Sequence, residues 1–458
     1  MKNQKVIISV VSILVIILVW FGAVVALNNH EAEKTQADLV KQANEFRDKG
    51  LFVRAYPLYE QALEIKTENN RDIQEDLLLA YYEDQRYPDY LNYVDSLALT
   101  ADKASADNFL KCAEIMQMQG RVAESVDRAF EGLAEYPDYK PLEDFIETYR
   151  YSCMIFPVGA SYVGNFASRS YKTAAYTTDE KWLFLDSAGY FTYDTEYEEL
   201  RNYSTKGLCP VKVDGKWGLV DDYRNKYSID DTGVDDVIAT DGSYILAVQN
   251  GKMSYYSIDF DIIDENLKYD NLSLISDDYV IAATNGNEHY LLGRGFVKLS
   301  DKSYEHIAIN SWMYPSVGGI VMLKENGRWY LCDTNGKHIT DESFAYAKAP
   351  EEEGGLIAVA NDDGRWGFID TTGRLVIPYK YEDANSFSDG LGAVKEYDEW
   401  DFIDATDTVK VKLGVENLNP FHDGIAVGKN GEDSIIIKLY FTDKDLKNAK
   451  AGVRNEEL

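Results

Sequence analysis

The C-terminal part of the chain is a repeat, and this feature constrains the fold more than any other. Bulky anchor residues recur at Trp182, Trp217, Met253, His289, Trp329, Trp366, Trp400 and about Ile436, separated by 35, 36, 36, 40, 37, 34 and about 36 residues. An apolar run that ends in a polar turn precedes each anchor, as in GGLIAVANDDG before Trp366. A fixed period of this length is typical of proteins in which each unit buries its apolar face against the next. We therefore expect eight copies of one unit between about Phe156 and Tyr440.

Each copy has the composition of short β-strands. Runs rich in Tyr, Val and Ile are separated by Gly- and Asp-containing turns. In the Asp-x-x-Gly turns at 186–189, 333–336 and 370–373, the Asp side chain is expected to accept backbone N–H bonds and the Gly to take a left-handed conformation. The Gly after Trp permits close approach, so that a neighbouring indole can lie over it. We expect GLGAVKE and WGFID to pair as a hairpin with one face inward.

The best copy, GRWGFIDTTGRLVIPYKYEDANSFSDGLGAVKE at 364–396, resembles the WG-repeat (KWG) family. The residues that carry the resemblance are Gly364-Arg365-Trp366-Gly367-Phe368-Ile369-Asp370, Gly373, Val376-Ile377-Pro378, Tyr381, Ala384, Phe387 and Gly390-Leu391, and Gly215-Lys216-Trp217-Gly218 repeats the core. The third and fourth copies are matched by period alone, since Met253 and His289 replace Trp. The resemblance implies that the following residues define the repeat and serve the fold: Trp182, Trp217, Gly218, Trp329, Trp366, Gly367, Asp370, Gly373 and Trp400.

Eight units of three or four strands predict a β-propeller. Seven and eight blades are both compatible with the repeat, because the first and last copies can combine to close the ring. An elongated β-solenoid of stacked hairpins is the alternative fold.

The segment 31–150 has apolar and small residues at helical spacing. Its clearest part, Asp38–Ile65, resembles a tetratricopeptide (TPR) helix pair, and further matches follow one and two 35-residue periods later. The positions concerned are Ala43, Phe46, Gly50, Ala55, Tyr59 and Ala62, then Ala80, and then Ala113, Gly120, Ser125, Gly132 and Pro137. The resemblance implies a concave face that binds a peptide or protein, with Asn44 and Arg47 as candidate groove residues. A spacer role for the same helices is left open.

The run Val6–Leu27 has 22 residues without a charge, which is enough for a helix to span about 30 Å of hydrocarbon. A cleaved signal peptide usually has a shorter apolar core, of about 7–15 residues. Lys2 and Lys5 precede the run and acidic residues follow it. The positive-inside rule therefore predicts a single-pass signal anchor in the cell membrane, with the N-terminus in the cytoplasm and the large domains outside.

No residue pattern points to catalysis, a cofactor or a metal. The formal charge of −32 argues against nucleic-acid binding, although cationic partners and metal ions remain open. The five His form no metal-binding spacing, and His289 at an anchor position predicts a packed core residue. The four Cys lie far apart without a CxxC motif, which favours buried thiols. Glu351-Glu352-Glu353 is read as a solvated loop, and SWMYPSVGG at 311–319 marks a long interval where a specific function is expected.

Together these features predict an α + β multidomain chain. We expect a cytoplasmic tail at 1–5, a transmembrane signal anchor at 6–27, TPR-like helices at 31–150, a WG-repeat β domain at 152–442 and a polar tail at 443–458. The two resemblances imply a non-catalytic scaffold of the bacterial cell envelope that binds proteins or cell-surface ligands. A glycan-acting hydrolase, with carboxylates at the propeller centre, and a purely structural spacer are the alternatives. A small-molecule ligand is left unassigned.

Overall fold

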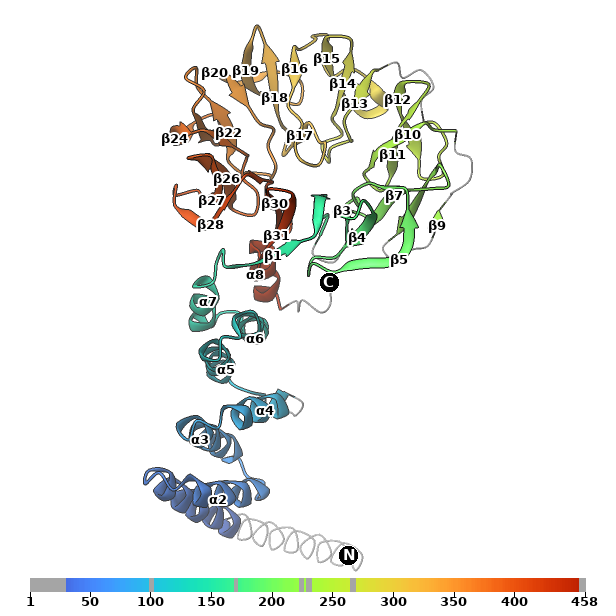
Figure 1. Ribbon diagram of the computed structural model, residues 1–458. Helices are drawn as coiled ribbons and strands as arrows, with labels where there is room; N and C mark the ends of the chain where they lie inside the picture. Colours follow the sequence, from blue (N-terminus) through green and yellow to red (C-terminus); the bar gives the residue numbers. More distant parts are fainter. Residues whose placement is uncertain are drawn as a thin grey trace, which may run out of the picture. The chain divides into compact units, whose positions relative to one another are not determined.

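The computed structural model describes residues 30–98, 103–168, 172–221, 226–227, 233–263 and 269–452 (Figure 1). These residues form two compact units. The helical unit contains the described residues up to Thr148 and those from Lys447 onward, and the β unit runs from Tyr149 to Leu446. None of the helices in these ranges is both long and apolar enough to cross a membrane. The predicted span at 6–27 lies outside the described residues.

The helical unit begins with a helix at 30–47 and continues with helices joined by short turns. They are α2 (Phe52–Glu64), α3 (Asn70–Glu83), α4 (Tyr87–Ala98), α5 (Ala106–Met118), α6 (Val122–Glu135) and α7 (Lys140–Glu147). The helices that start at Phe52, Tyr87 and Val122 are spaced by 35 residues. Gly50 and Gly120, at the turns before two of them, have φ of +70° and +76°, which favours glycine.

Small residues allow these helices to approach one another. Ala43, Ala55 and Ala62 have no exposed surface, and the Tyr59 ring fills the space between them. A last helix, α8 (Asp443–Lys450), occupies part of the segment expected to be a polar tail. Leu446 and Ala449 are buried there, so these residues are packed structure rather than a free tail. Within the helical unit, Lys450 forms an ion pair with Glu143 at 2.5 Å.

The β unit is an eight-bladed β-propeller, which confirms the predicted propeller and excludes the solenoid (Figure 1). Each blade is one antiparallel sheet, numbered here in chain order. Blade 1 contains β2 (Ala160–Val163), β3 (Thr173–Thr177), β4 (Trp182–Leu185) and β5 (Phe191–Tyr197). Blade 2 contains β6 (Glu199–Leu200), β7 (Leu208–Val213), β8 (Lys216–Asp221) and β9 (Lys226–Tyr227).

The next three blades carry the less regular copies. Blade 3 contains β10 (Asp236–Thr240), β11 (Tyr244–Gln249) and β12 (Lys252–Ser257). Blade 4 contains β13 (Asn271–Leu272), β14 (Ile281–Asn285) and β15 (Glu288–Leu292), followed by the short helix η1 (Arg294–Phe296). Blade 5 contains β16 (His306–Ile307), β17 (Ser316–Val317), β18 (Ile320–Glu325), β19 (Arg328–Asp333) and β20 (His338–Phe344).

The last three blades complete the ring. Blade 6 contains β21 (Tyr346–Ala347), β22 (Ile357–Ala360), β23 (Trp366–Ile369) and β24 (Leu375–Tyr381). Blade 7 contains β25 (Asp383–Ala384), β26 (Leu391–Glu396), β27 (Glu399–Asp404) and β28 (Val409–Val415). Blade 8 joins β29 (Asn417–Leu418), β30 (Ile425–Asn430) and β31 (Asp433–Leu439) to β1 (Cys153–Val158), which pairs antiparallel with β31. The first and last copies therefore close the ring in one sheet, and the blade number is eight.

All eight anchors lie on the strand that follows the main hairpin turn of their blade: β4, β8, β12, β15, β19, β23, β27 and β31. In four blades, a side chain from or just after the first strand covers the anchor Trp. Two of these pairs are aromatic, with ring centroids 5.8 Å apart for Tyr162 and Trp182 and 5.6 Å apart for His306 and Trp329. In the other two, a cation lies over the ring: Arg201 is 4.7 Å from the Trp217 centroid, and Lys348 is 5.2 Å from the Trp366 centroid. Aromatic and cation–π contacts thus link the first and third strands of these sheets.

The expectation of one inward face is wrong, because blades pack face to face and their middle strands are buried on both sides. All four residues of β22 are buried. Ile357 and Val359 contact blade 5, whereas Ala358 contacts blade 7. The predicted pairing of GLGAVKE with WGFID is also wrong: β26 pairs with β27, and β23 pairs with β22.

The turns agree with their predicted chemistry. Asp370 Oδ1 accepts the N–H groups of Thr372 and Arg374 at 2.9 and 3.1 Å, and Gly373 has φ of +87°. The Thr372 hydroxyl and these N–H groups lower the pKa of Asp370 to about 2. Asp186 and Asp333 accept the corresponding bonds in blades 1 and 5.

Gly367 permits a close approach, but the neighbour is not an indole. A Cβ at this position would lie 2.6 Å from the carbonyl oxygen of Ile377 and 3.0 Å from the Pro378 carbonyl carbon. These atoms belong to the backbone of β24, the outer strand of the same blade. Glycine is therefore required by the spacing between two strands.

Candidate functional site

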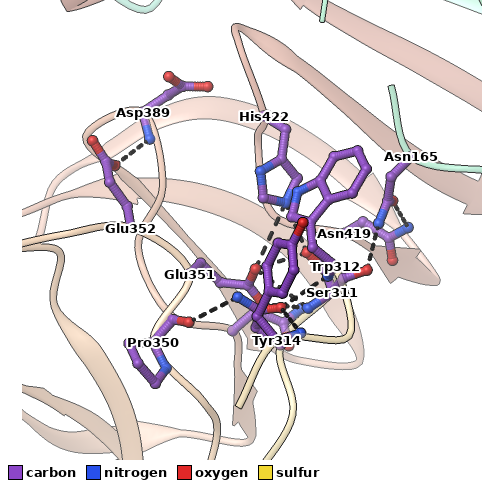
Figure 2. Close-up of polar contacts among 12 residues, drawn as sticks. Asn165, Ser311, Trp312, Tyr314, Pro350, Glu351, Glu352, Asp389, Asn419 and His422 are labelled. Atoms are coloured by element: carbon purple, nitrogen blue, oxygen red, sulfur yellow. Dashed lines mark hydrogen bonds and ion pairs between the residues drawn. The ribbon is translucent and has the colours of Figure 1, made fainter. Parts of the chain in front are cut away.

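One loop of the propeller crosses its axis. Blade 5 neighbours blades 4 and 6 in the ring, yet Ser311 in this blade bonds to blades 1 and 8. Asn165 Nδ2 of blade 1 donates to the Ser311 carbonyl oxygen at 3.0 Å, and the Ser311 side chain contacts His422 of blade 8. Figure 2 shows Ser311 and Trp312 between residues of these distant blades. The segment 310–314 therefore extends across the centre of the ring, and we call it the axial loop.

The axial loop exists because blade 5 has a long connection between its first strands. The connection from β16 to β18 covers 308–319, whereas the connection from β25 to β26 in blade 7 covers only 385–390. Asn310 gives the loop its shape, because its Oδ1 accepts the N–H groups of Trp312 and Tyr314 at 3.0 and 2.9 Å. Met313 takes a left-handed φ of +65° at the tip.

Three polar side chains meet at the axial loop. The Ser311 Oγ lies 2.7 Å from Glu351 Oε2 and 2.7 Å from His422 Nε2. The Ser311 backbone N–H also donates to Glu351 Oε1 at 3.1 Å. The Trp312 ring meets the His422 ring edge to face, with centroids 4.9 Å apart. We call Glu351, Ser311 and His422 the axial cluster.

Burial determines the protonation of the axial cluster. The side chains of Glu351 and His422 are 8% and 12% exposed. Burial disfavours both charged forms, so it raises the pKa of Glu351 to about 7 and lowers the pKa of His422 to about 3. The 3.6 Å approach of Glu351 Oε2 to His422 Nε2 would be an ion pair only if both groups were charged, and burial disfavours both charged forms.

The axial cluster resembles a nucleophilic triad in composition but not in geometry. A Ser-His-acid triad needs the carboxylate on the ring nitrogen remote from the serine, where it orients the imidazole. Here Glu351 lies beside Nε2, the same nitrogen that contacts Ser311. The arrangement is a chain of hydrogen bonds from Glu351 through Ser311 to His422. Across the described ranges, no three His, Cys, Asp or Glu side chains come together as a metal site.

The reading of Glu351-Glu352-Glu353 as a solvated loop is wrong for Glu351. Its carboxylate is buried because the loop after β21 turns toward the axial loop. Glu352 Oε2 accepts the Asp389 N–H at 2.7 Å. The segment SWMYPSVGG, singled out in the sequence, contains Ser311 and Trp312. His422 was missed, although comparing LNPFHDG with ANSFSDG shows that it replaces Ser388 of the preceding copy.

His289, expected to be a packed core residue, is only half-buried and stacks on His306 with ring centroids 5.0 Å apart. Of the four Cys, Cys112, Cys209 and Cys332 are buried, whereas Cys153 is half-buried; all are free thiols.

The helical unit carries a second candidate site, a groove of about 520 Å³ between the helix at 30–47 and α3. Ala37, Val40 and Ile73 give it an apolar floor. Its charged and polar lining consists of Gln36, Lys41, Asn44, Glu45, Asp48, Asn69, Asp72 and Asp76. Four carboxylates against one ammonium leave this lining with three net negative charges. We call it the acidic groove.

The two predicted groove residues have different positions. Asn44 lines the acidic groove, donates to Asp76 at 3.3 Å and accepts a hydrogen bond from the Tyr59 hydroxyl. Arg47 is 13% exposed and is not among the lining residues. Its guanidinium lies 3.0 Å from Asp76 and 3.3 Å from Asp48. Arg47 is therefore already paired, and it positions carboxylates of the groove wall.

A family of known proteins supports the repeat. The family model described as WG containing repeat matches residues 186–217 and 366–400, which confirms the resemblance at these two places. No curated protein sequence matches the chain. Among solved structures, a eukaryotic initiation factor is 13% identical, with a TM-score of 0.42 and coverage of 58% of this chain and 81% of that chain. The WD40 domain of SCAP from fission yeast is 9% identical, with a TM-score of 0.41 and coverage of 64% and 99%.

Proposed function

We propose that this protein is a non-catalytic, membrane-anchored scaffold whose helical unit binds a protein partner in the acidic groove. In this proposal the segment 6–27 anchors the chain, and both units lie on the extracytoplasmic side. The helices act as a TPR-like array, and the WG-repeat propeller provides the second interaction module. A chain that contains both a repeat propeller and a helical region is consistent with an interaction scaffold, because both architectures present extended surfaces.

The TPR-like assignment is supported by the packing of the helices. Helices of similar length begin 35 residues apart, and glycine turns precede two of them. The positions expected to be small or aromatic, Ala55, Tyr59 and Ala62, are fully buried. This is the arrangement that places one helix of each pair along a shared groove.

The acidic groove is the observation that carries the proposal. An apolar floor with a charged rim matches peptide recognition, in which apolar anchors give affinity and charge gives specificity. Arg47 is already paired with carboxylates. Among the described lining residues, Lys41 is the one cation available to pair with a peptide carboxylate. The partner proposed is therefore a cationic peptide segment with apolar side chains.

Binding of a Lys- and Leu-containing amphipathic peptide to the full chain tests the proposal, measured by fluorescence anisotropy at low and high salt. Asp72 and Glu45 line the groove, and no ion pair is recorded for either of them in the described residues. The double substitution Asp72→Lys and Glu45→Lys is expected to weaken binding about tenfold or more at low salt, with a smaller loss at high salt.

The matched control is the double substitution Glu60→Lys and Glu64→Lys, at two exposed positions on α2 outside the groove lining. It makes a comparable charge reversal on the same helical unit and is expected to leave the affinity within about twofold. Equal weakening by both variants would show that only net charge matters. Failure of the cationic peptide to bind better than its Glu-substituted counterpart would favour the spacer role.

A further inference from the structure

The axial loop is held by hydrogen bonds to four other blades. Its own Asn310 Nδ2 donates to the Pro350 carbonyl oxygen of blade 6 at 3.2 Å. The Leu274 N–H of blade 4 donates to the Met313 carbonyl oxygen at 3.0 Å. Blades 1, 6 and 8 are joined to Ser311 through Asn165, Glu351 and His422 (Figure 2). Release of this one loop would therefore remove the links across the axis.

The axial cluster has two complete patterns of hydrogen bonds, which differ by one proton. With Glu351 ionised, the Ser311 hydroxyl donates to the carboxylate and accepts from a protonated Nε2 of His422. With Glu351 protonated, the carboxyl group donates to Ser311, and the hydroxyl then donates to the bare Nε2 of the other neutral tautomer of His422, in which Nδ1 carries the ring proton. Both patterns satisfy the two 2.7 Å contacts, because a hydroxyl has one proton and two acceptor lone pairs.

We propose that the axial cluster is a proton-linked latch: gain or loss of a proton at Glu351 or His422 changes how firmly the axial loop is held across the propeller centre. This inference does not depend on the acidic groove, which lies in the other unit. It concerns how the propeller responds to its surroundings. Both groups are in the same chain of hydrogen bonds, so each one affects the whole loop.

Other charged groups around the latch have small or indirect effects. Lys348, which follows β21, favours the ionised form of Glu351, but the burial of Glu351 outweighs it. Burial alone lowers the pKa of His422. Burial also raises the pKa of Tyr314 on the axial loop to about 12, aided by Asp241 and Asp277. The carboxylates of Glu352, Asp389 and Asp278 in adjoining loops accept backbone N–H groups of neighbouring blades.

The two titrating groups act in opposite directions. Glu351 has a raised pKa in the closed loop, so closure is favoured at low pH and is weakened as pH rises from about 4.5 to about 7. His422 has a lowered pKa, so closure is weakened as pH falls from about 6.5 toward about 3. Between pH 5 and 6.5 the two effects cancel, and the wild-type loop is expected to have constant protection.

Amide hydrogen exchange of the full chain, read by mass spectrometry for a peptide that contains 310–315, tests the latch. Exchange times are scaled to the chemical exchange rate at each pH. Glu351→Gln is expected to leave only the effect of His422 titration. The exchange protection of the loop amides should then rise about tenfold per pH unit between pH 5 and 6.5. In His422→Gln, the glutamine amide reaches the position of Nε2, and only the effect of Glu351 titration remains. The exchange protection should then fall about tenfold per pH unit over the same range.

Opposite slopes in the two variants, with a flat wild type, would establish the latch. Equal slopes in all three proteins would overturn it. If a variant fails to fold, the wild type alone is sufficient for a second test by NMR titration of its five His. The imidazole of His422, which contacts the Trp312 ring, is expected to stay neutral down to pH 5, and a normal titration of His422 would also overturn the proposal.

Discussion

At the scale of single residues, Gly367 has little room for a side chain. Its replacement by Ala would place a Cβ 2.6 Å from the Ile377 carbonyl oxygen, which is a backbone atom that cannot rotate away. We expect Gly367→Ala to lower the free energy of unfolding by about 1–3 kcal/mol, as overpacking does in other cores. Urea denaturation of the full chain, followed by circular dichroism, measures this change.

The control for that substitution is Gly159→Ala. A Cβ at Gly159 would have no heavy atom within 4 Å, and the residue does not have a positive φ. The change in stability is expected to be within about 0.5 kcal/mol. Equal losses at both positions would show that the close approach at Gly367 is relieved by movement of β24.

Residues that recur with the period were predictable, whereas the residues of the axial cluster were not. Trp366, Gly367 and Asp370 follow from the repeated pattern, since each has a counterpart in other copies. Glu351 looked like part of a solvated acidic run, because a sequence does not show that loops of blades 5 and 8 will surround it. The burial of a loop side chain depends on partners that lie far away along the chain.

At the scale of the element, a carboxylate recurs beside the first strand of most blades. It accepts a backbone N–H at the tip of the main hairpin turn in the same blade. The pairs are Glu198 with Gly215, Asp235 with Asn250, Asp270 with Gly286, Glu305 with Gly327, Glu382 with Asp398 and Glu416 with Gly431. Part of the strong negative charge therefore serves the fold, by capping turns.

Removal of one such carboxylate is expected to have a small, local cost. Glu305 accepts the Gly327 N–H at 2.9 Å on an exposed turn. We expect Glu305→Ala to lower the free energy of unfolding by about 0.5–1 kcal/mol. The double variant Glu305→Ala and Glu416→Ala is expected to lose the sum of the two single losses, because the two residues lie in blades that are not adjacent. The control is Glu432→Ala, at an exposed turn position. Thermal denaturation is expected to show no change in stability for this variant. Equal effects from all three positions would indicate a general charge effect.

At the scale of the whole molecule, the repeat period predicted the ring but not its details. Eight anchors separated by seven similar intervals indicated eight units, while the choice between seven and eight blades depended on where Phe156 and its neighbours pair. The burial of middle strands on both faces follows from the packing of one blade on the next, which a single copy does not show. The four extra residues before Trp329 marked an insertion without indicating that it crosses the axis.

The closing strand β1 is expected to be essential for the ring. A chain that begins at residue 149 keeps β1, whereas one that begins at 160 leaves β31 without its partner. We expect the shorter chain to lose about 3 kcal/mol or more and to aggregate through the open edge. Differential scanning calorimetry and light scattering of the two chains compare them directly.

A synthetic peptide of residues 152–159 provides the control for truncation. Added to the chain that begins at 160, it is expected to restore the melting temperature by adding the missing strand, whereas a scrambled peptide has no effect. Equal stability of both truncated chains without peptide would show that a three-stranded last blade is sufficient to close the ring.

The pairing of β1 with β31 also imposes an order in time on synthesis. β1 ends at Val158, and its partner begins at Asp433, 275 residues later. Translation adds about 5–20 residues per second, so β1 leaves the ribosome on the order of 15–55 s before the strand that it pairs with. During that delay the nascent chain carries finished blades and an unpaired, partly apolar strand. The topology therefore leaves β1 without its β31 partner until the last blade has been synthesised.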